Sequence, residues 1–260
     1  MRHFRNELRR AFGWPWIFAV VLMWIPMVLS NTESFPWMFA ERIDSTSAFI
    51  NAFNKSAILQ VSLFAVACPF ARSYLQDIHS GAIKYAIART GRAQYAAGKF
   101  AANAIASAAA LFFSQFVFLI FCILCFPYPD IAYRQVFEHD EVMFALRYSA
   151  PVLYYAILLG IQIVSSVAWS SLALALSCFV PNQYIVLCFP FLLFTLVSSL
   201  SAHPAVRKVF DACWLVYNGN LLASQWGGQL AFYLIFFAAL AALSFLLFFR
   251  SVMAYDGSTR

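Results

Sequence analysis

Apolar residues fall into long runs along this chain, and the charged residues gather in the segments between them. A run of about 20 apolar residues is long enough to cross the hydrocarbon core of a bilayer as a helix. The pattern therefore predicts an all-α integral membrane protein with six transmembrane helices, at approximately 13–30, 54–75, 97–127, 148–180, 183–202 and 229–249.

Two of these predicted spans need a further argument. The second is uncharged only from Ser56 to Ala71, but Lys55 and Arg72 can extend from its ends toward water. The stretch 148–202 holds no formally charged residue and is too long for one crossing, so it must hold two spans. The turn-forming tripeptide Pro181–Gln183 divides them.

Residues 1–12 have a different pattern, in which apolar and basic positions alternate with the period of a helix. One face would carry apolar side chains (Met1, Phe4, Leu8, Ala11 and Phe12), and the other would carry polar ones (Arg2, Arg5, Asn6, Arg9 and Arg10). Such a helix lies flat in the membrane interface.

Composition and charge support this interpretation. The chain is 63% hydrophobic and 11% charged, which excludes the ordinary soluble class. The net charge is +6: short basic segments at 1–12, at 72–99 and after 249 together carry +8, and the remaining segments carry −2. Charge divided between segments in this way predicts the orientation in the membrane, and it lacks the continuous basic face that binds nucleic acid. By the positive-inside rule both termini are cytosolic, including the tail 251–260, and the loop 203–228 is outside.

No motif for catalysis is found along the chain. Zinc-protease, hydrolase and paired-cysteine zinc patterns do not occur, and Gly91 to Lys99 lacks the spacing of a phosphate loop. Cys122 and Cys125 have the spacing of a redox motif, but they lie inside an apolar run, where packing is the expected role. We therefore expect no catalytic residue, metal or cofactor on this chain. The candidates for lining a pathway are polar and aromatic residues of the spans, although such glutamines most often only join helices: Gln60, Phe64, Gln115, Gln162, Phe189 and Phe194.

The segment 77–92 is predicted to be a cytosolic knob between the second and third spans. It starts at Asp77, has an interruption at Gly81, and continues as a short helix that ends in a turn at Arg89–Arg92. The apolar face of that helix would consist of Ile83, Ala86 and Ile87.

This segment resembles the loop between the second and third spans of ABC-2-type exporter permeases. In that family an acidic residue precedes a Gly by four positions, and a short helix, an Arg-containing turn, an aromatic residue and a Gly-Lys pair follow. The corresponding residues are Asp77, Gly81, Arg89 to Arg92, Tyr95, and Gly98 with Lys99. The likeness extends over the whole chain through its six spans, but Asp77 replaces the usual Glu, and the turn lacks the common Pro-x-Ser-Arg.

The resemblance implies a permease subunit of an ATP-driven exporter in the plasma membrane. It would pair with a second permease copy and with two separate ABC ATP-binding subunits, which bind ATP and Mg. Its spans two and five would line a central route under short outer helices in 203–228. Coupling to the ATPase would use Asp77, Gly81, Ile83, Ala86, Ile87, Arg89, Arg92 and Lys99, and a connector helix would use Phe4, Glu7, Leu8 and Arg9.

The substrate class is inferred from the composition of the spans. Phe-rich spans with few polar groups favour a hydrophobic or amphipathic substrate such as a peptide, a drug or a lipid-linked molecule. Two alternatives to an exporter subunit stay open. One is a secondary transporter or a membrane-embedded enzyme, and the other is a non-transporting scaffold or immunity protein.

Overall fold

A computed structural model of the chain describes residues 2–30, 44–55, 58–127, 149–200, 203 and 226–255. Within these ranges the chain forms α-helices joined by turns and contains no strand. Most of the predicted outer loop 203–228 and residues 256–260 of the predicted tail 251–260 lie outside the described residues, whereas residues 251–253 of the tail are helical. The helices are α1 (Arg2–Ala11), α2 (Trp14–Ser30), α4 (Ser45–Lys55), α5 (Ile58–Ala65), α6 (Ser73–His79), α7 (Ala82–Thr90), α8 (Arg92–Cys125), α10 (Pro151–Leu176), α11 (Gln183–Ser199) and α13 (Trp226–Met253).

Three helices of the described chain are long and apolar enough to cross a membrane: α8, α10 and the part of α13 from Ala231 to Met253. A fourth is added if α1 and α2, which meet at a bend of 43°, are counted together. The part of the chain that the structure describes is therefore all-helical and has helices that could span a membrane. The count of six spans stays a prediction, since α11 has 17 residues and α5 has eight.

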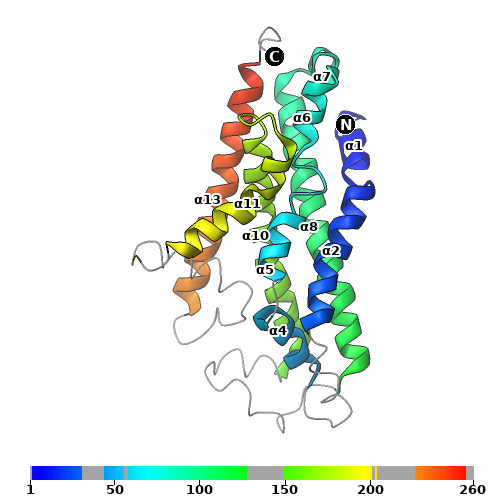
Figure 1. Ribbon diagram of the computed structural model, residues 1–260, viewed down its shortest axis with the longest axis vertical. Helices are drawn as coiled ribbons and strands as arrows, with labels where there is room; N and C mark the ends of the chain where they lie inside the picture. Colours follow the sequence, from blue (N-terminus) through cyan, green and yellow to red (C-terminus); the bar gives the residue numbers. More distant parts are fainter. Residues whose placement is uncertain are drawn as a thin grey trace.

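Helices α8, α10 and α13 run side by side along the molecule, and α2 lies beside α8 (Figure 1). The contact of α2 with α8 is close because Ala102, Ala106 and Ala110 form a fully buried stripe of small side chains. Across this stripe, the Trp16 indole donates a hydrogen bond of 3.1 Å to the carbonyl of Ala106. Small residues thus set the distance between the two helices.

The predicted second span, 54–75, is not one helix. α5 ends at Ala65, a turn covers 66–72, and α6 begins at Ser73. Pro69 lies in the turn and has no N–H to donate, so the helical hydrogen-bond ladder is interrupted there. Cys68 N–H instead closes a tight bond of 3.1 Å to the Ala65 carbonyl. The turn is buried from Val66 to Ala71, as irregular backbone must be at membrane depth.

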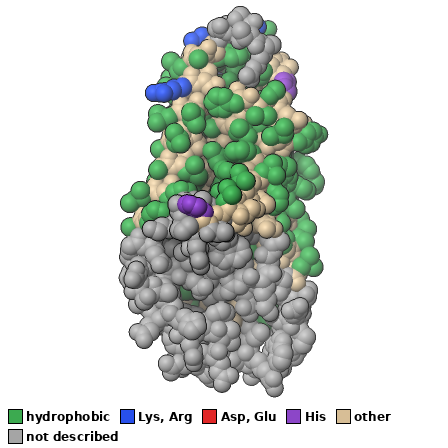
Figure 2. All heavy atoms as spheres, turned by 60° about the vertical axis from the view of Figure 1, so that its left-hand side comes forward, with side chains coloured by type: hydrophobic (Ala, Val, Ile, Leu, Met, Phe, Trp, Pro, Cys, Tyr) green, Lys and Arg blue, Asp and Glu red, His purple; other side chains and the backbone are tan. Residues whose placement is uncertain are grey.

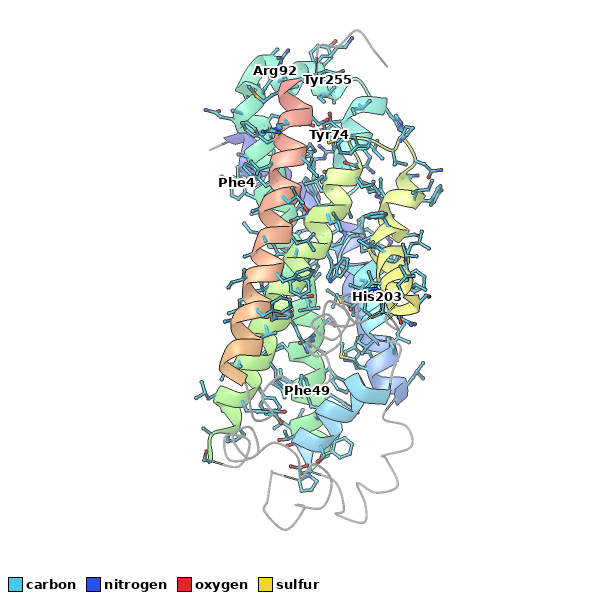
Figure 3. All side chains as sticks on the ribbon, turned by 90° about the vertical axis from the view of Figure 1, so that its left-hand side faces the viewer. Phe4, Phe49, Tyr74, Arg92, His203 and Tyr255 are labelled. Carbon is cyan, nitrogen blue, oxygen red and sulfur yellow. The ribbon has the colours of Figure 1, made fainter. Side chains whose placement is uncertain are left out.

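Charged and apolar side chains cover different parts of the surface along the long axis of the molecule. On the face in Figure 2, hydrophobic side chains cover most of the described surface, and Lys and Arg appear only near one end. In Figure 3, Arg92 and Tyr255 mark that end, and Phe49 lies toward the other. Exposed side chains such as Phe113, Phe116 and Ile235 belong to the apolar belt. A belt of this kind is expected to face lipid.

Candidate functional site

Two glycines shape the backbone at the charged end. Gly81 has φ +70° at the start of α7, and Gly91 has φ +79° between α7 and α8. Both angles lie in the left-handed region, which glycine adopts without strain. The chain can therefore turn twice in a few residues and place the short helix α7 between α6 and α8.

Gly81→Ala is expected to lower the free energy of unfolding by about 1–2 kcal/mol. A Cβ at this position would meet no atom within 4 Å, so the cost arises from the backbone angle alone. Denaturant titration in detergent micelles measures it. The matched control is Gly160→Ala in α10, where space is also free and a helical alanine should stabilise by up to about 1 kcal/mol. Equal losses of unfolding free energy in the two variants would contradict the left-handed backbone assigned to Gly81.

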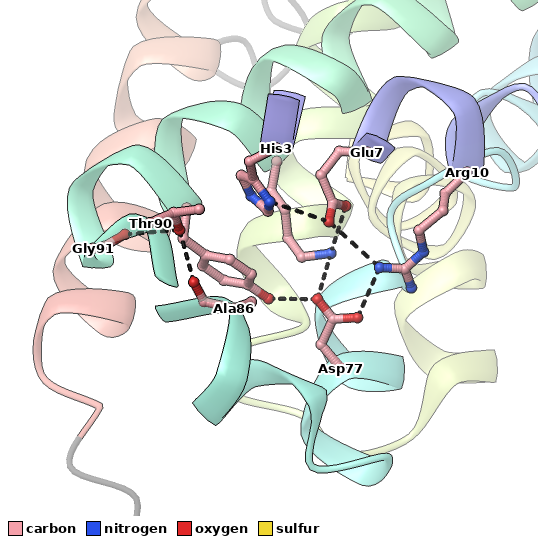
Figure 4. Close-up of polar contacts among 9 residues, drawn as sticks. His3, Glu7, Arg10, Asp77, Ala86, Thr90 and Gly91 are labelled. Carbon is pink, nitrogen blue, oxygen red and sulfur yellow. Dashed lines mark hydrogen bonds and ion pairs between the residues drawn. The ribbon is translucent and has the colours of Figure 1, made fainter. Parts of the chain in front are cut away.

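Asp77 of α6 is the centre of a buried ion cluster that joins three helices (Figure 4). Its Oδ2 lies 2.9 Å from the Lys99 Nζ of α8 and accepts a 2.7 Å hydrogen bond from the Tyr95 hydroxyl. Its Oδ1 accepts a 2.9 Å bond from Nη1 of Arg10 in α1. Both carboxylate oxygens are thus occupied by strong donors from other helices.

Glu7 of α1 is the second acid of the cluster. Its Oε2 lies 3.1 Å from the Lys99 Nζ, and its Oε1 lies 3.5 Å from Arg10 Nη1. His3, one turn earlier, has its Nδ1 4.0 Å from Glu7 Oε1. The two acids therefore face two bases, and the buried charges cancel.

Lys99 is fully buried, with no exposed surface. Its ammonium lies 5.0 Å from the ring centre of Phe70 and 5.4 Å from that of Tyr95, so aromatic faces cover the sides that the carboxylates leave open. The His3 ring stacks on Tyr95 with a centroid distance of 5.7 Å. A fully buried lysine is stable only with partners of this kind.

The surroundings of Asp77 favour its charged form. Burial acts to raise the pKa of this carboxyl, but Lys99, the Tyr95 hydroxyl and Arg10 together outweigh burial and hold the pKa below its ordinary value. The carboxylate therefore stays ionised at neutral pH. No group of three His, Cys, Asp or Glu side chains suited to a metal ion gathers in the described ranges.

A groove of about 540 Å³ opens beside the cluster, between α1 and α7. From α1 it is lined by His3, Glu7 and Arg10, among others, and from α7 by Tyr85 and Arg89. The Tyr85 side chain is 81% exposed at its rim. The groove thus has a buried, charge-balanced floor and an open, aromatic and basic edge.

The faces of α7 differ from the sequence prediction. Ile83, expected to pack into a partner, has no exposed surface and packs inside the chain with Tyr74, Leu174 and Phe248. Ala86 and Ile87 are half-buried against the same cluster. The apolar face of α7 is therefore the face that holds it to its own protein, and the exposed face carries Lys84, Tyr85, Ala88 and Arg89.

The other predicted coupling and connector residues take separate positions. The Arg92 guanidinium donates a 2.8 Å bond to the carbonyl of Met253, which ties the start of α8 to the end of α13. Lys99, given a coupling role by the resemblance, is bound within the chain to Glu7 and Asp77. In α1, Phe4 and Leu8 are half-buried, and Arg9 is exposed.

The candidate pathway residues do not form one site in the described chain. Gln60 is exposed on α5, Phe64 and Phe189 are half-buried, and Gln115, Gln162 and Phe194 are buried on α8, α10 and α11. Phe64 and Phe194 belong to the same packed apolar core. Phe64 and Phe194 therefore take packing positions, whereas Gln60 lies on the surface.

Comparison with known proteins identifies no relative: no family model, no curated protein and no solved structure matches this chain. The resemblance to ABC-2 permeases therefore rests on residues 73–99 and on the span pattern. Sequence reasoning missed the pairing of Glu7 with Lys99, which are 92 residues apart. The available signal was that acids are rare beside the basic segments, so Glu7 and Asp77 were natural partners for a lysine next to an apolar run.

Proposed function

We propose that this chain is the membrane-spanning subunit of an ATP-driven exporter of the ABC-2 permease type. It would have six spans, an interfacial helix α1 and cytosolic termini, and it would reside in the plasma membrane. Two separate cassette subunits would bind ATP and Mg, and a second permease copy would complete the complex. The cargo would be hydrophobic or amphipathic.

The observation that carries the proposal is the ion cluster beneath α7. Through Glu7, Asp77 and Lys99 it joins α1, α6 and α8 at the end of the bundle where α7 exposes its polar face. α8, a helix of 34 residues that holds Lys99 near its start, runs from this cluster through the apolar belt. A movement of α7 driven by a cytosolic ATPase would therefore be transmitted through the ion cluster to α8, which crosses the membrane.

Reconstitution tests the proposal. The chain purified alone should neither bind nor hydrolyse ATP, since its Gly-Lys pair lacks the spacing of a phosphate loop. An ATPase subunit that copurifies with it should restore ATP-dependent export of an amphipathic dye from inside-out vesicles. ATPase activity in a preparation shown to lack any cassette subunit would contradict the proposal.

The topology can be tested separately. In a cysteine-free background, an impermeant thiol reagent applied outside cells should label a cysteine at His139 and spare one at Ser80. His139 lies outside the described residues, and Ser80 is exposed at the end of α6. The reverse labelling pattern would overturn the cytosolic placement of α7.

One observation favours a second function, proton-coupled secondary transport. Glu7, Asp77 and Lys99 are buried ionisable groups, and such groups in membrane proteins often form proton relays. On that alternative, transport would need a proton gradient and no ATP. Export from vesicles that continues after the gradient is collapsed, and stops when ATP is withheld, would favour the ABC-type subunit.

A further inference from the structure

A second, smaller cavity lies where the charged end of the molecule meets the apolar belt. It has a volume of about 60 Å³ between the α1–α2 junction and the start of α6. The polar part of the cavity wall comes from α6, from the residue before α6 and from α1, and the apolar part comes from two prolines and one phenylalanine. The lining residues are Arg10, Pro15, Pro69, Phe70, Arg72, Ser73 and Gln76.

The charges around this cavity do not balance. Arg10, Lys99, Glu7 and Asp77 neutralise one another in the neighbouring ion cluster. Arg72 is an additional base, and no carboxylate of the described residues forms an ion pair with it. The cavity therefore has one uncompensated positive charge, which fits a singly charged anion.

Its donors match an anion with several oxygens. Arg10 uses Nη1 for its two acids, so the donors on Nη2 and Nε stay available. The Ser73 residue is 2% exposed, and its hydroxyl has no hydrogen-bond partner among the described residues. A buried hydroxyl without a partner is unfavourable, so a ligand that accepts a hydrogen bond from it is favoured.

The size of the cavity and its depth in the membrane restrict the choice of ligand further. A water needs roughly 10–15 Å³, so the cavity accommodates about four to six waters, close to the five heavy atoms of a phosphate group. Arg72 follows the uncharged run that ends at Ala71, and Pro15 opens the uncharged helix α2. The cavity thus lies at the depth where lipid headgroups border the hydrocarbon core.

We propose that this cavity binds the phosphodiester of an anionic phospholipid. Arg72 and the free donors of Arg10 would contact the phosphate oxygens, Ser73 would donate its hydroxyl, and the acyl chains would lie outside against the apolar belt. The proposal is independent of the transport function above, because it needs only that the protein lies in a bilayer.

Native mass spectrometry of the full chain in detergent, titrated with phosphatidylglycerol, tests the proposal. Arg72→Gln should raise the Kd of the first bound lipid about tenfold, and Ser73→Ala about threefold, because charge-assisted bonds are lost. The matched control is Arg9→Gln, which removes the same charge from an exposed site on α1 outside the cavity. This control should change the Kd less than twofold.

Two outcomes would overturn the proposal. If Arg9→Gln weakens binding as much as Arg72→Gln, lipid is held by diffuse surface charge. If inorganic phosphate displaces phosphatidylglycerol when both are present at equal concentration, the site takes a free anion and the lipid assignment is wrong. The Ser73→Ala variant tests the site even if the Arg72→Gln variant misfolds, because it removes one oxygen atom and leaves every charge in place.

Discussion

Replacing Lys99 with methionine is expected to lower the free energy of unfolding by about 3–5 kcal/mol, because it removes the cation that Glu7 and Asp77 share in a buried site. Methionine matches the lysine side chain except for the terminal ammonium, so the loss of stability reports the missing charge. Asp77 keeps Arg10 and Tyr95, whereas Glu7 keeps only the longer contacts to Arg10 and His3 among the described residues. In the Lys99→Met variant, α1 should therefore detach from the helix bundle before the other helices unfold.

Denaturant titration gives the stability, and limited proteolysis at Arg5 or Arg9 of α1 reports its release. The control is Lys84→Met, which removes a lysine from the exposed face of α7 and should change stability by less than about 0.5 kcal/mol. In the double variant Lys99→Met with Glu7→Gln, part of the stability should return because no unpaired acid is left on α1. If Lys99→Met is as stable as the native chain, the cluster does not hold α1 in place.

Changes on the exposed face of α7 are expected to weaken binding of an ATPase subunit without unfolding the protein. Tyr85→Ala removes an aromatic side chain that is 81% exposed, and Arg89→Ala removes a base beside it on the rim of the groove. Aromatic and arginine side chains dominate interface energies, with losses of 2 kcal/mol or more per residue. Each variant should therefore raise the Kd for the ATPase about thirtyfold.

The control for Tyr85→Ala is Tyr184→Ala, which removes an exposed tyrosine at the start of α11. It should leave the Kd within twofold. Ile83→Asp serves a different purpose: Ile83 is buried in the chain's own core, so this variant should lower stability and reduce transport through misfolding. Normal binding by both Tyr85→Ala and Arg89→Ala would show that α7 is not the docking element.

Local patterns along the chain predicted much of the helical layout. The interruption expected at Gly81 precedes α7, and the turn expected at Pro181–Gln183 separates α10 from α11. There the Asn182 side chain accepts a 2.9 Å bond from the Tyr184 N–H and caps α11. Such signals depend on a few neighbouring residues, which a sequence displays directly.

Other features depend on contacts that no local pattern contains. Helical periodicity identified an apolar face at Ile83, but it does not say whether such a face meets a partner or the protein's own core. The break at Pro69 was missed because the uncharged run around it satisfies a hydropathy criterion whether or not the helix is continuous. The ion cluster was missed because its members come from three separate helices.

The spacing of those members along the chain has a consequence for biosynthesis. Glu7 and Lys99 are separated by 92 residues, so α1 emerges long before the lysine that holds it. At 5–20 residues per second, the delay is roughly 5–20 s. During that interval Glu7 has no lysine partner, and α1 can rest only on the surface of the membrane. The N-terminal helix is therefore expected to be among the last elements to reach its final position during assembly, after α8 has been inserted.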